Sequence, residues 1–317
     1  MGKRISLLLL AILFSLCAGC HWVEKKYYDN ERKILMSETT WAGKNQDGPY
    51  KTYYRSGKIK SEAHFAMNKL EGPLKKYYEN GNLKKEENYS DGKLNGLVTL
   101  YCENGLPISK YHFHKGEFCG RAELYSECNG ILKEICHYKN GVMNGEKTVY
   151  FPDGKIREKS NYLNGKLEGV SILYYENGNV ETKQAFKGGN KEGLSFSYYE
   201  NGKIKSKESY KGGKYNGLIQ FYHPNGALRE ETAYNMGQEE GVAKYYYKNG
   251  NMKSETPYKN GLKNGIKKQY AGSGYLWLEE SFKDNVKEGP SKQYNRNGLV
   301  IKVLHYKAGK LISQEQN

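Results

Sequence analysis

The chain has 317 residues and a formal net charge of +15, from 50 Lys and Arg against 35 Asp and Glu. It contains 30 Tyr and 37 Gly but only nine Phe and three Trp, so much of its apolar material consists of rings with a polar tip. Such side chains suit a thin, half-wet sheet better than the aliphatic core of a compact globule. The composition therefore argues against two ordinary globular domains, which the length alone would allow.

The N-terminal residues are predicted to be an export signal. Lys3 and Arg4 precede an apolar run at 5–18, which is shorter than the roughly 20 residues that span a bilayer. Without these two basic residues the formal charge falls from +15 to +13. A surplus of this size attracts anionic partners, but it is spread through the whole chain, so we expect a solvated, lysine-rich face. Export makes nucleic acid an improbable partner.

Residues 16–20 read LCAGC, which resembles a bacterial lipobox. The resemblance implies that 1–19 is a signal peptide and that Cys20 is lipidated. Cys17 stands where the lipobox prefers Leu, and simple secretion by cleavage before Cys20 is the alternative. His21 replaces the Asp that retains lipoproteins in the inner membrane. The expected location is thus the bacterial cell envelope, as an outer-membrane lipoprotein facing the periplasm or the cell surface.

Glycine recurs with a step of 24 residues, except for one step of 25. Such a period predicts a repeat architecture of stacked supersecondary units. A second glycine series, from Gly57 to Gly298, runs in phase. Eleven units follow, with Tyr five places after the first glycine and another aromatic residue eight places after the second. The first glycine of each unit is Gly48, Gly72, Gly96, Gly120, Gly145, Gly169, Gly193, Gly217, Gly241, Gly265 or Gly289.

Each unit is predicted to be a β-hairpin. The unit at 193–216 reads GLSFSYYENGKIKSKESYKGGKYN, in which Asn-Gly separates two β-prone runs. If 200–202 forms a three-residue turn with a bulge, Tyr198, Ile204 and Tyr210 share one face. A strict two-residue turn would send Tyr198 to the other face. The bulged turn is preferred, and successive hairpins are expected to form an elongated, single-sheet, all-β solenoid.

The repeats do not cover the whole chain. Residues 20–47 are expected to hold the lipid tether and a degenerate cap repeat, because Trp41 precedes Gly48 by the interval that separates Tyr89 from Gly96. The eleven repeats occupy 48–312. Residues 313–317 are expected to be a polar tail.

The pattern G-x-x-x-x-Y-Y-x-N-G-K-I-K-x-E-x-x-Y-x-x-G-K-x-x-G resembles the bacterial variant of the MORN (membrane occupation and recognition nexus) repeat. The resemblance covers 48–312. Bacterial proteins of this kind are often labelled antitoxins, which implies protein binding rather than chemistry. Eukaryotic MORN proteins are associated with membrane tethering and scaffolding. A scaffold of this kind does not fix a function.

The repeats offer no pattern typical of catalysis. Four histidines share one repeat position about 10 Å apart, which is too far for one zinc ion: His64, His112, His137 and His305. Glutamates that alternate with Lys on the second strand are expected to pair across strands. Every glycine is assigned to a turn, which leaves no phosphate-binding loop. We therefore expect no enzyme activity, no metal and no cofactor.

Four cysteines lie in the third and fourth units, around the extra residue. An even number of cysteines in an exported chain suggests disulfides. The hairpin arrangement favours Cys119 with Cys136 and Cys102 with Cys128, although the second pair approaches the limit of about 7 Å between Cα atoms. A metal site and unpaired thiols are the alternatives.

The expected function is a non-enzymatic scaffold that binds a protein partner through many weak, repeated contacts. One alternative is a module that binds cell-wall polysaccharide or anionic lipid. Another is an antitoxin or immunity protein that neutralises a toxin by binding it. The sequence does not indicate which face or which repeats make contact.

Overall fold

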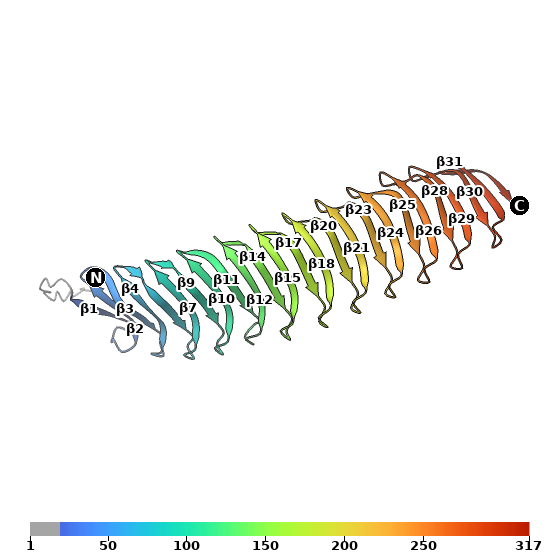
Figure 1. Ribbon diagram of the computed structural model, residues 1–317. Coiled ribbons are helices and arrows are strands. Elements are labelled where there is room, and N and C mark those ends of the chain that lie inside the picture. The colour runs from blue at the N-terminus through green and yellow to red at the C-terminus, as the bar shows by residue number, and fades with distance from the viewer. Residues whose placement is uncertain (1–19, 317) are drawn as a thin grey trace, which may run out of the picture. The chain divides into compact units, whose positions relative to one another are not determined.

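The computed structural model describes residues 20–316, and every regular element in this range is a β-strand (Figure 1). None of the described residues forms a helix that is long and apolar enough to cross a membrane. Contacts divide the chain into two units. The first is Met1–Phe118 with Glu127–Gly130, and the second is Cys119–Ser126 with Ile131–Asn317.

In the first unit, each long strand from β1 to β9 pairs antiparallel with the next long strand in the chain. Two-residue strands lengthen the second arm of some hairpins. The strands are β1 His21–Tyr27, β2 Leu35–Ala42, β3 Asn45–Tyr53, β4 Ile59–Ala66, β5 Lys69–Leu70, β6 Gly72–Tyr77, β7 Leu83–Ser90, β8 Lys93–Leu94, β9 Gly96–Tyr101, β10 Pro107–His114 and the start of β11 Glu117–Tyr125.

The second unit continues the same pairing rule from the rest of β11 onwards. Its hairpins follow one another in chain order (Figure 1). The strands are β12 Leu132–Lys139, β13 Val142–Met143, β14 Gly145–Tyr150, β15 Ile156–Leu163, β16 Lys166–Leu167, β17 Gly169–Tyr174, β18 Val180–Lys187, β19 Asn190–Lys191, β20 Gly193–Tyr198, β21 Ile204–Lys211, β22 Lys214–Tyr215, β23 Gly217–Tyr222, β24 Leu228–Asn235, β25 Gln238–Tyr246, β26 Met252–Lys259, β27 Leu262–Lys263, β28 Gly265–Tyr270, β29 Leu276–Lys283, β30 Val286–Tyr294, β31 Val300–Lys307 and β32 Lys310–Gln316.

These strands confirm the predicted all-β hairpin repeat, and the Asn-Gly turn has the expected form. Between β20 and β21 the Tyr199 amide donates to the carbonyl of Lys203 at 2.8 Å. The Gly202 amide donates back to the Tyr199 carbonyl at 2.8 Å, with φ of +80° at Gly202. Residues 200–202 are therefore a three-residue turn that ends in a left-handed glycine.

A second bulge directly after this turn makes the prediction of shared faces wrong. Tyr198 pairs with Ile204, but Ser197 pairs with Ser206, so Lys205 is an extra residue in β21. One extra residue moves every later side chain to the other side of the sheet. Tyr198 and Ile204 therefore share one face, whereas Tyr210 lies on the opposite face.

Polar contacts agree with this assignment. Ser197 and Ser206 meet at 2.6 Å between their Oγ atoms, and Glu208 accepts hydrogen bonds from both Ser206 and Tyr210. We call this side, and its equivalents in other repeats, the Tyr210 face. The other side, which carries Leu194, Phe196, Tyr198 and Ile204 in this repeat, is the Tyr198 face.

The first glycine series lies inside the strands rather than in turns, which corrects the expectation from sequence. Tyr210 pairs with Tyr215, but Ser206 pairs with Phe221, so the chain between Tyr215 and Phe221 has two more residues than the strand opposite it. Gly217 has φ of +105°, a conformation that glycine adopts at the lowest cost. Each repeat thus has one bulge at this glycine and another after the Asn-Gly turn.

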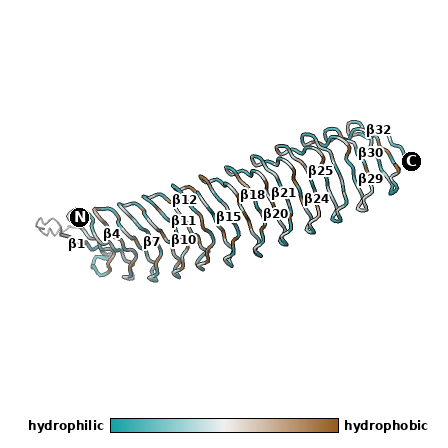
Figure 2. Tube along the Cα trace, viewed as in Figure 1, coloured by the Kyte–Doolittle hydropathy of each residue, from teal (hydrophilic) through white to brown (hydrophobic). Residues whose placement is uncertain are grey.

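The core of the sheet is thin and made of small side chains. Most fully buried residues occupy the Tyr210 face near the middle of the strands, as do Ser195, Ile219, Thr232 and Ala243. No tyrosine is fully buried among the described residues. Along the chain, short hydrophobic stretches are interspersed with hydrophilic ones (Figure 2). The strands are bent along their length (Figure 1).

Both ends of the described chain extend the repeat pattern. β1 pairs with β2, and Trp22 stacks on Trp41 with their ring centroids 5.8 Å apart, as suits a degenerate cap repeat. Residues 313–316, expected to be a polar tail, instead belong to β32, which pairs with β31. The signal peptide expected at 1–19 lies outside the described residues.

The cysteines form one disulfide rather than two. Cys102 and Cys128 are bonded, with their Cα atoms 5.5 Å apart. Cys119 and Cys136 are both free thiols, so the pairing expected between them is wrong. Cys136 pairs in register with Ala122, three residues along β11 from Cys119, which is about 10 Å along an extended strand.

Candidate binding surface

In several repeats the first tyrosine ties neighbouring hairpins together on the Tyr198 face. The Tyr53 hydroxyl donates to Glu38 and the Tyr294 hydroxyl donates to Glu279, both at 2.6 Å. Burial, with the hydrogen bond to the glutamate, raises the pKa of Tyr53 to about 12 and that of Tyr294 likewise to about 12. These tyrosines are therefore neutral, and their hydroxyls donate hydrogen bonds to a glutamate of the preceding repeat.

The second tyrosine of the Tyr-Tyr pair makes a different link. Its hydroxyl donates to the backbone carbonyl of the first tyrosine in the next repeat, as Tyr199 does to Tyr222 at 2.7 Å. The same bond recurs in both units, from Tyr28, Tyr54, Tyr78, Tyr175 and Tyr247. In one repeat Cys102 occupies this position, and there the disulfide to Cys128 joins the neighbouring turns.

The Asn-Gly turns form a second ladder. The side chain of Asn225 accepts from the Ala227 amide at 3.1 Å and donates to the carbonyl of Lys248 in the next turn at 2.9 Å. Asn80 and Asn177 make equivalent bonds to the next turn. Asparagine thus closes its own turn and fixes the spacing to the next one.

A basic side chain covers several of the second tyrosines. The Nζ atoms of Lys84 and Lys253 lie 5.2 Å and 5.9 Å from the ring centroids of Tyr78 and Tyr247, within the range of a cation–π contact. These lysines are the extra residues of the bulge after the turn. The bulge that reverses the faces therefore also places a positive charge over these rings.

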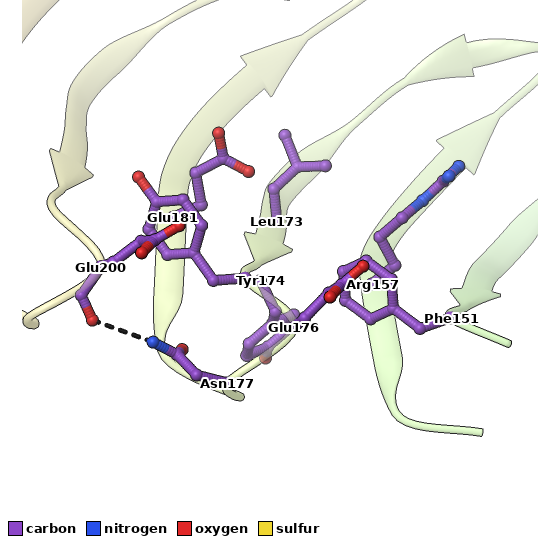
Figure 3. A pocket seen from close by; sticks show the side chains of 9 residues that line it. Phe151, Arg157, Leu173, Tyr174, Glu176, Asn177, Glu181 and Glu200 are labelled. Atoms are coloured by element: carbon purple, nitrogen blue, oxygen red, sulfur yellow. Dashed lines mark hydrogen bonds between the residues drawn. The ribbon is translucent and has the colours of Figure 1, made fainter. Parts of the chain in front are cut away.

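A pocket of about 590 Å³ opens beside this tyrosine row in the second unit (Figure 3). It lies where Phe151 takes the place of the second tyrosine. This side chain has no hydroxyl to donate to the next repeat. None of its lining residues is Ser, Cys or His. The side-chain amide of Asn177 donates a hydrogen bond to the Glu200 carbonyl at 3.1 Å. The pocket is lined by Phe151, Arg157, Leu173, Tyr174, Tyr175, Glu176, Asn177, Glu181 and Glu200.

Five consecutive repeats of the second unit expose a large aliphatic side chain at one position of the Tyr198 face. The exposed fraction is 60% for Leu194 and 48% for Leu218. The cross-strand partner is always Ala, Ser or Pro, which cannot cover the aliphatic group. We call these residues the aliphatic row: Val170, Leu194, Leu218, Val242 and Ile266.

Exposed lysines follow the aliphatic row. Two residues after the small cross-strand partner stands a lysine in four of the five repeats, namely Lys187, Lys211, Lys259 and Lys283. No ion pair forms at these lysines in the described part of the chain. On the other flank, Lys183 and Lys207 face Ile172 and Phe196 across the strands rather than an acid. In the next three repeats Glu231, Glu255 and Glu279 occupy this second position, so the positive charge beside the aliphatic row is concentrated on the first flank.

Among the described residues, the histidines and cysteines singled out from the sequence do not gather into a metal-binding cluster. Cys20 is exposed at the start of the described chain, and the pKa of the Cys136 thiol is raised by burial. Of the histidine row, His137 contacts the Glu146 carbonyl at 2.8 Å and His305 approaches Glu315 at 3.4 Å. Across 20–316, no three His, Cys, Asp or Glu residues gather in a way that could hold a metal ion.

Sequence reasoning missed the aliphatic row, although a signal was present. Val, Leu or Ile directly follows the first glycine in five successive repeats. The register predicted from sequence did not indicate that this position would face outwards beside a small residue.

Comparison with solved structures adds little. The TcdB2-TccC3-Cdc42 complex overlaps 90% of this chain at 10% identity and a TM-score of 0.17, and the Photorhabdus luminescens Tc holotoxin pore overlaps 90% at 11% and 0.18. This chain spans only 19% and 20% of those chains. Such low scores support no argument about this protein. No curated protein matches the chain.

A family model for the MORN repeat variant matches seven segments. They are 46–66, 70–91, 143–164, 167–187, 191–211, 215–236 and 239–260. The units that begin at Gly96, Gly120, Gly265 and Gly289 are not matched, although they fold into the same strands. By sequence pattern and by structure, this chain carries MORN-variant repeats in at least these seven segments.

Proposed function

We propose that this protein is a non-enzymatic, lipid-anchored scaffold of the cell envelope that binds a protein partner through its repeats. The observation that carries the binding role is the aliphatic row on the Tyr198 face. Large exposed apolar patches on otherwise polar surfaces mark sites of interaction. The tyrosine and asparagine ladders support this role, because they hold successive hairpins at a fixed spacing before any partner arrives.

Export and anchoring rest on the sequence of the first 20 residues. The basic start, the apolar run and the lipobox-like LCAGC favour lipidation at Cys20. Cys20 is exposed and precedes β1, so a lipid there would not disturb the sheet.

Binding of an anionic polysaccharide or lipid is the second candidate. Lysines placed over the second tyrosines favour it, since rings and charges suit an anionic, partly apolar ligand. An antitoxin-like role, in which the repeats neutralise a toxin, would use the same protein-binding surface.

The test of protein binding is site-specific photocrosslinking in the host cell. A photoreactive amino acid replaces Leu218 in the aliphatic row or, as the control, the exposed Leu299 at an Asn-Gly turn. A protein adduct of one defined mass at position 218 and not at 299 is expected. The absence of any protein adduct at 218 would contradict the scaffold role.

Anchoring is tested separately by feeding labelled palmitate to cells that express the chain or its Cys20→Ser variant. Label is expected in the unaltered chain only, together with membrane association. Label in both variants, or in neither, would remove the anchor from the proposal.

A further inference from the structure

We propose that the aliphatic row binds an extended, acidic polypeptide segment whose apolar side chains recur at every third residue. This inference deepens the proposed scaffold role and rests on it, because it names the chemistry of the protein partner. It concerns only the second unit, where all five residues of the row lie.

The spacing of the row selects an extended chain. Successive row residues are two strands apart, which is about 9.6 Å at about 4.8 Å between neighbouring strands. A polyproline II segment advances about 9.3 Å in three residues, so its every third side chain keeps step with the row. An α-helix advances about 10.5 Å in seven residues and falls out of step by nearly 4 Å over four intervals.

The size of the row suits a short segment. Four intervals extend over about 38 Å, which a polyproline II segment covers with about 13 residues. Each of its apolar side chains could cover one half-exposed aliphatic group and the Ala, Ser or Pro beside it. Leu218 with Ala233 and Val242 with Pro257 are such pairs.

The charges beside the row select an acidic partner. On one flank Lys187, Lys211, Lys259 and Lys283 recur with the same period as the row and have no acid opposite. On the other flank only Lys183 and Lys207, beside the first two residues of the row, are without an acid across the strands, and glutamates follow at this position. Carboxylates placed between the apolar side chains of the partner would meet these lysines.

Charge argues against a second copy of the chain as the occupant, and spacing argues against a membrane. A second copy packed face to face would bring lysine rows together, which opposes a dimer through this surface. A fluid bilayer has no groups at a fixed spacing of about 10 Å, so the regular spacing of the row would not favour its binding.

The test uses the purified full chain and a fluorescent peptide of five Leu-Glu-Pro repeats, with binding measured by fluorescence anisotropy. Two further peptides carry Lys or Ser in place of Glu. Saturable binding of the acidic peptide is expected, at least tenfold tighter than that of either control peptide. Raising the salt from 50 to 300 mM should weaken it severalfold, because surface charges are screened.

The variant that tests the row is L194T/L218T, and its matched control is L299T/L311T. The exposed fractions are 60% and 48% for the first pair, and 63% and 52% for the second. Thr keeps a high strand propensity, so both variants should retain the thermal melt of the parent chain. The row variant should weaken peptide binding by about tenfold, from the apolar area no longer covered, and the control by less than twofold.

Three outcomes would overturn the proposal. The first is that the acidic peptide binds no tighter than the control peptides, or that both double variants weaken its binding equally. The second is row-dependent sedimentation with phosphatidylglycerol vesicles without peptide binding, which would assign the row to a membrane. The third is a dimer in sedimentation velocity that only L194T/L218T abolishes. A defined adduct from Leu218 in the crosslinking test would still support a protein partner if the peptide failed to bind.

Discussion

Gly265 and Gly193 provide a matched test of the bulge between repeats. Both begin a strand at the inter-repeat bulge, with φ of +122° and +79°. A Cβ atom on Gly265 would lie 2.9 Å from Cγ of Pro257, whereas one on Gly193 would meet nothing within 4 Å. G265A therefore adds a clash to the backbone strain, and G193A adds strain alone.

The two costs differ enough to measure. An L-residue in the left-handed region costs about 1–2 kcal/mol, which is the expected loss for G193A. Overpacking against a rigid ring adds about 1–3 kcal/mol, so G265A should lose about 2–5 kcal/mol. The difference of about 1–3 kcal/mol corresponds to a factor of about 5 to 150 in a local opening equilibrium.

Native-state hydrogen exchange is the suitable assay, because repeat proteins open locally and a global transition would average over many hairpins. The amide of Asn264 donates to the Pro257 carbonyl at 2.9 Å, and the amide of Glu192 donates to the Ala185 carbonyl at 2.9 Å. The exchange rate of each amide therefore measures the opening of the bulge beside it. Exchange at Asn264 in G265A should accelerate far more than exchange at Glu192 in G193A. Equal acceleration, or a larger effect in G193A, would refute the steric argument.

Three further predictions concern the ladders and the charges. Y199F removes the hydroxyl that donates to the Tyr222 carbonyl and should lower the local stability by about 1 kcal/mol, seen as faster amide exchange in the two turns it joins. Reduction of the Cys102–Cys128 disulfide, which closes a loop with a sequence separation of 26, should cost about 3 kcal/mol and lower the melting temperature of the unaltered chain but not of C102S. Burial raises the pKa of the Glu239 carboxyl above its unfolded value. Ionising this carboxyl therefore destabilises the folded state. The loss of stability is absent below the unfolded pKa and develops as the pH rises through the folded pKa. E239Q should therefore raise the melting temperature at pH 7 and not at pH 3.5, and a gain that persists at the lower pH would contradict this account.

The repeat and its turns could be predicted from sequence because both are local. The 24-residue glycine period defines the unit, and Asn201-Gly202 between two β-prone runs specifies a hairpin through backbone conformations that few other residues adopt. The three-residue turn with a left-handed glycine followed from the same local chemistry.

The face of the sheet that each side chain occupies could not be predicted from the local sequence. A single extra residue at Lys205 places Tyr210 opposite Tyr198, and nothing in the alternation of β21 signals that the register shifts there. The shift becomes visible only in the pairing of β21 with β20, where Tyr198 meets Ile204 but Ser197 meets Ser206. The cysteines show the same limit, since Cys136 opposite Ala122 is out of reach of Cys119.

The sequence by itself therefore determined the repeat unit, the two turns and the all-β class, all of which depend on residues close together in the chain. Only the tertiary structure decided which face each side chain occupies and which apolar residues remain exposed. Those properties depend on strand register, which is set by pairing between hairpins rather than by any one hairpin. The aliphatic row from Val170 to Ile266 exists as a surface only because that register holds in five successive repeats.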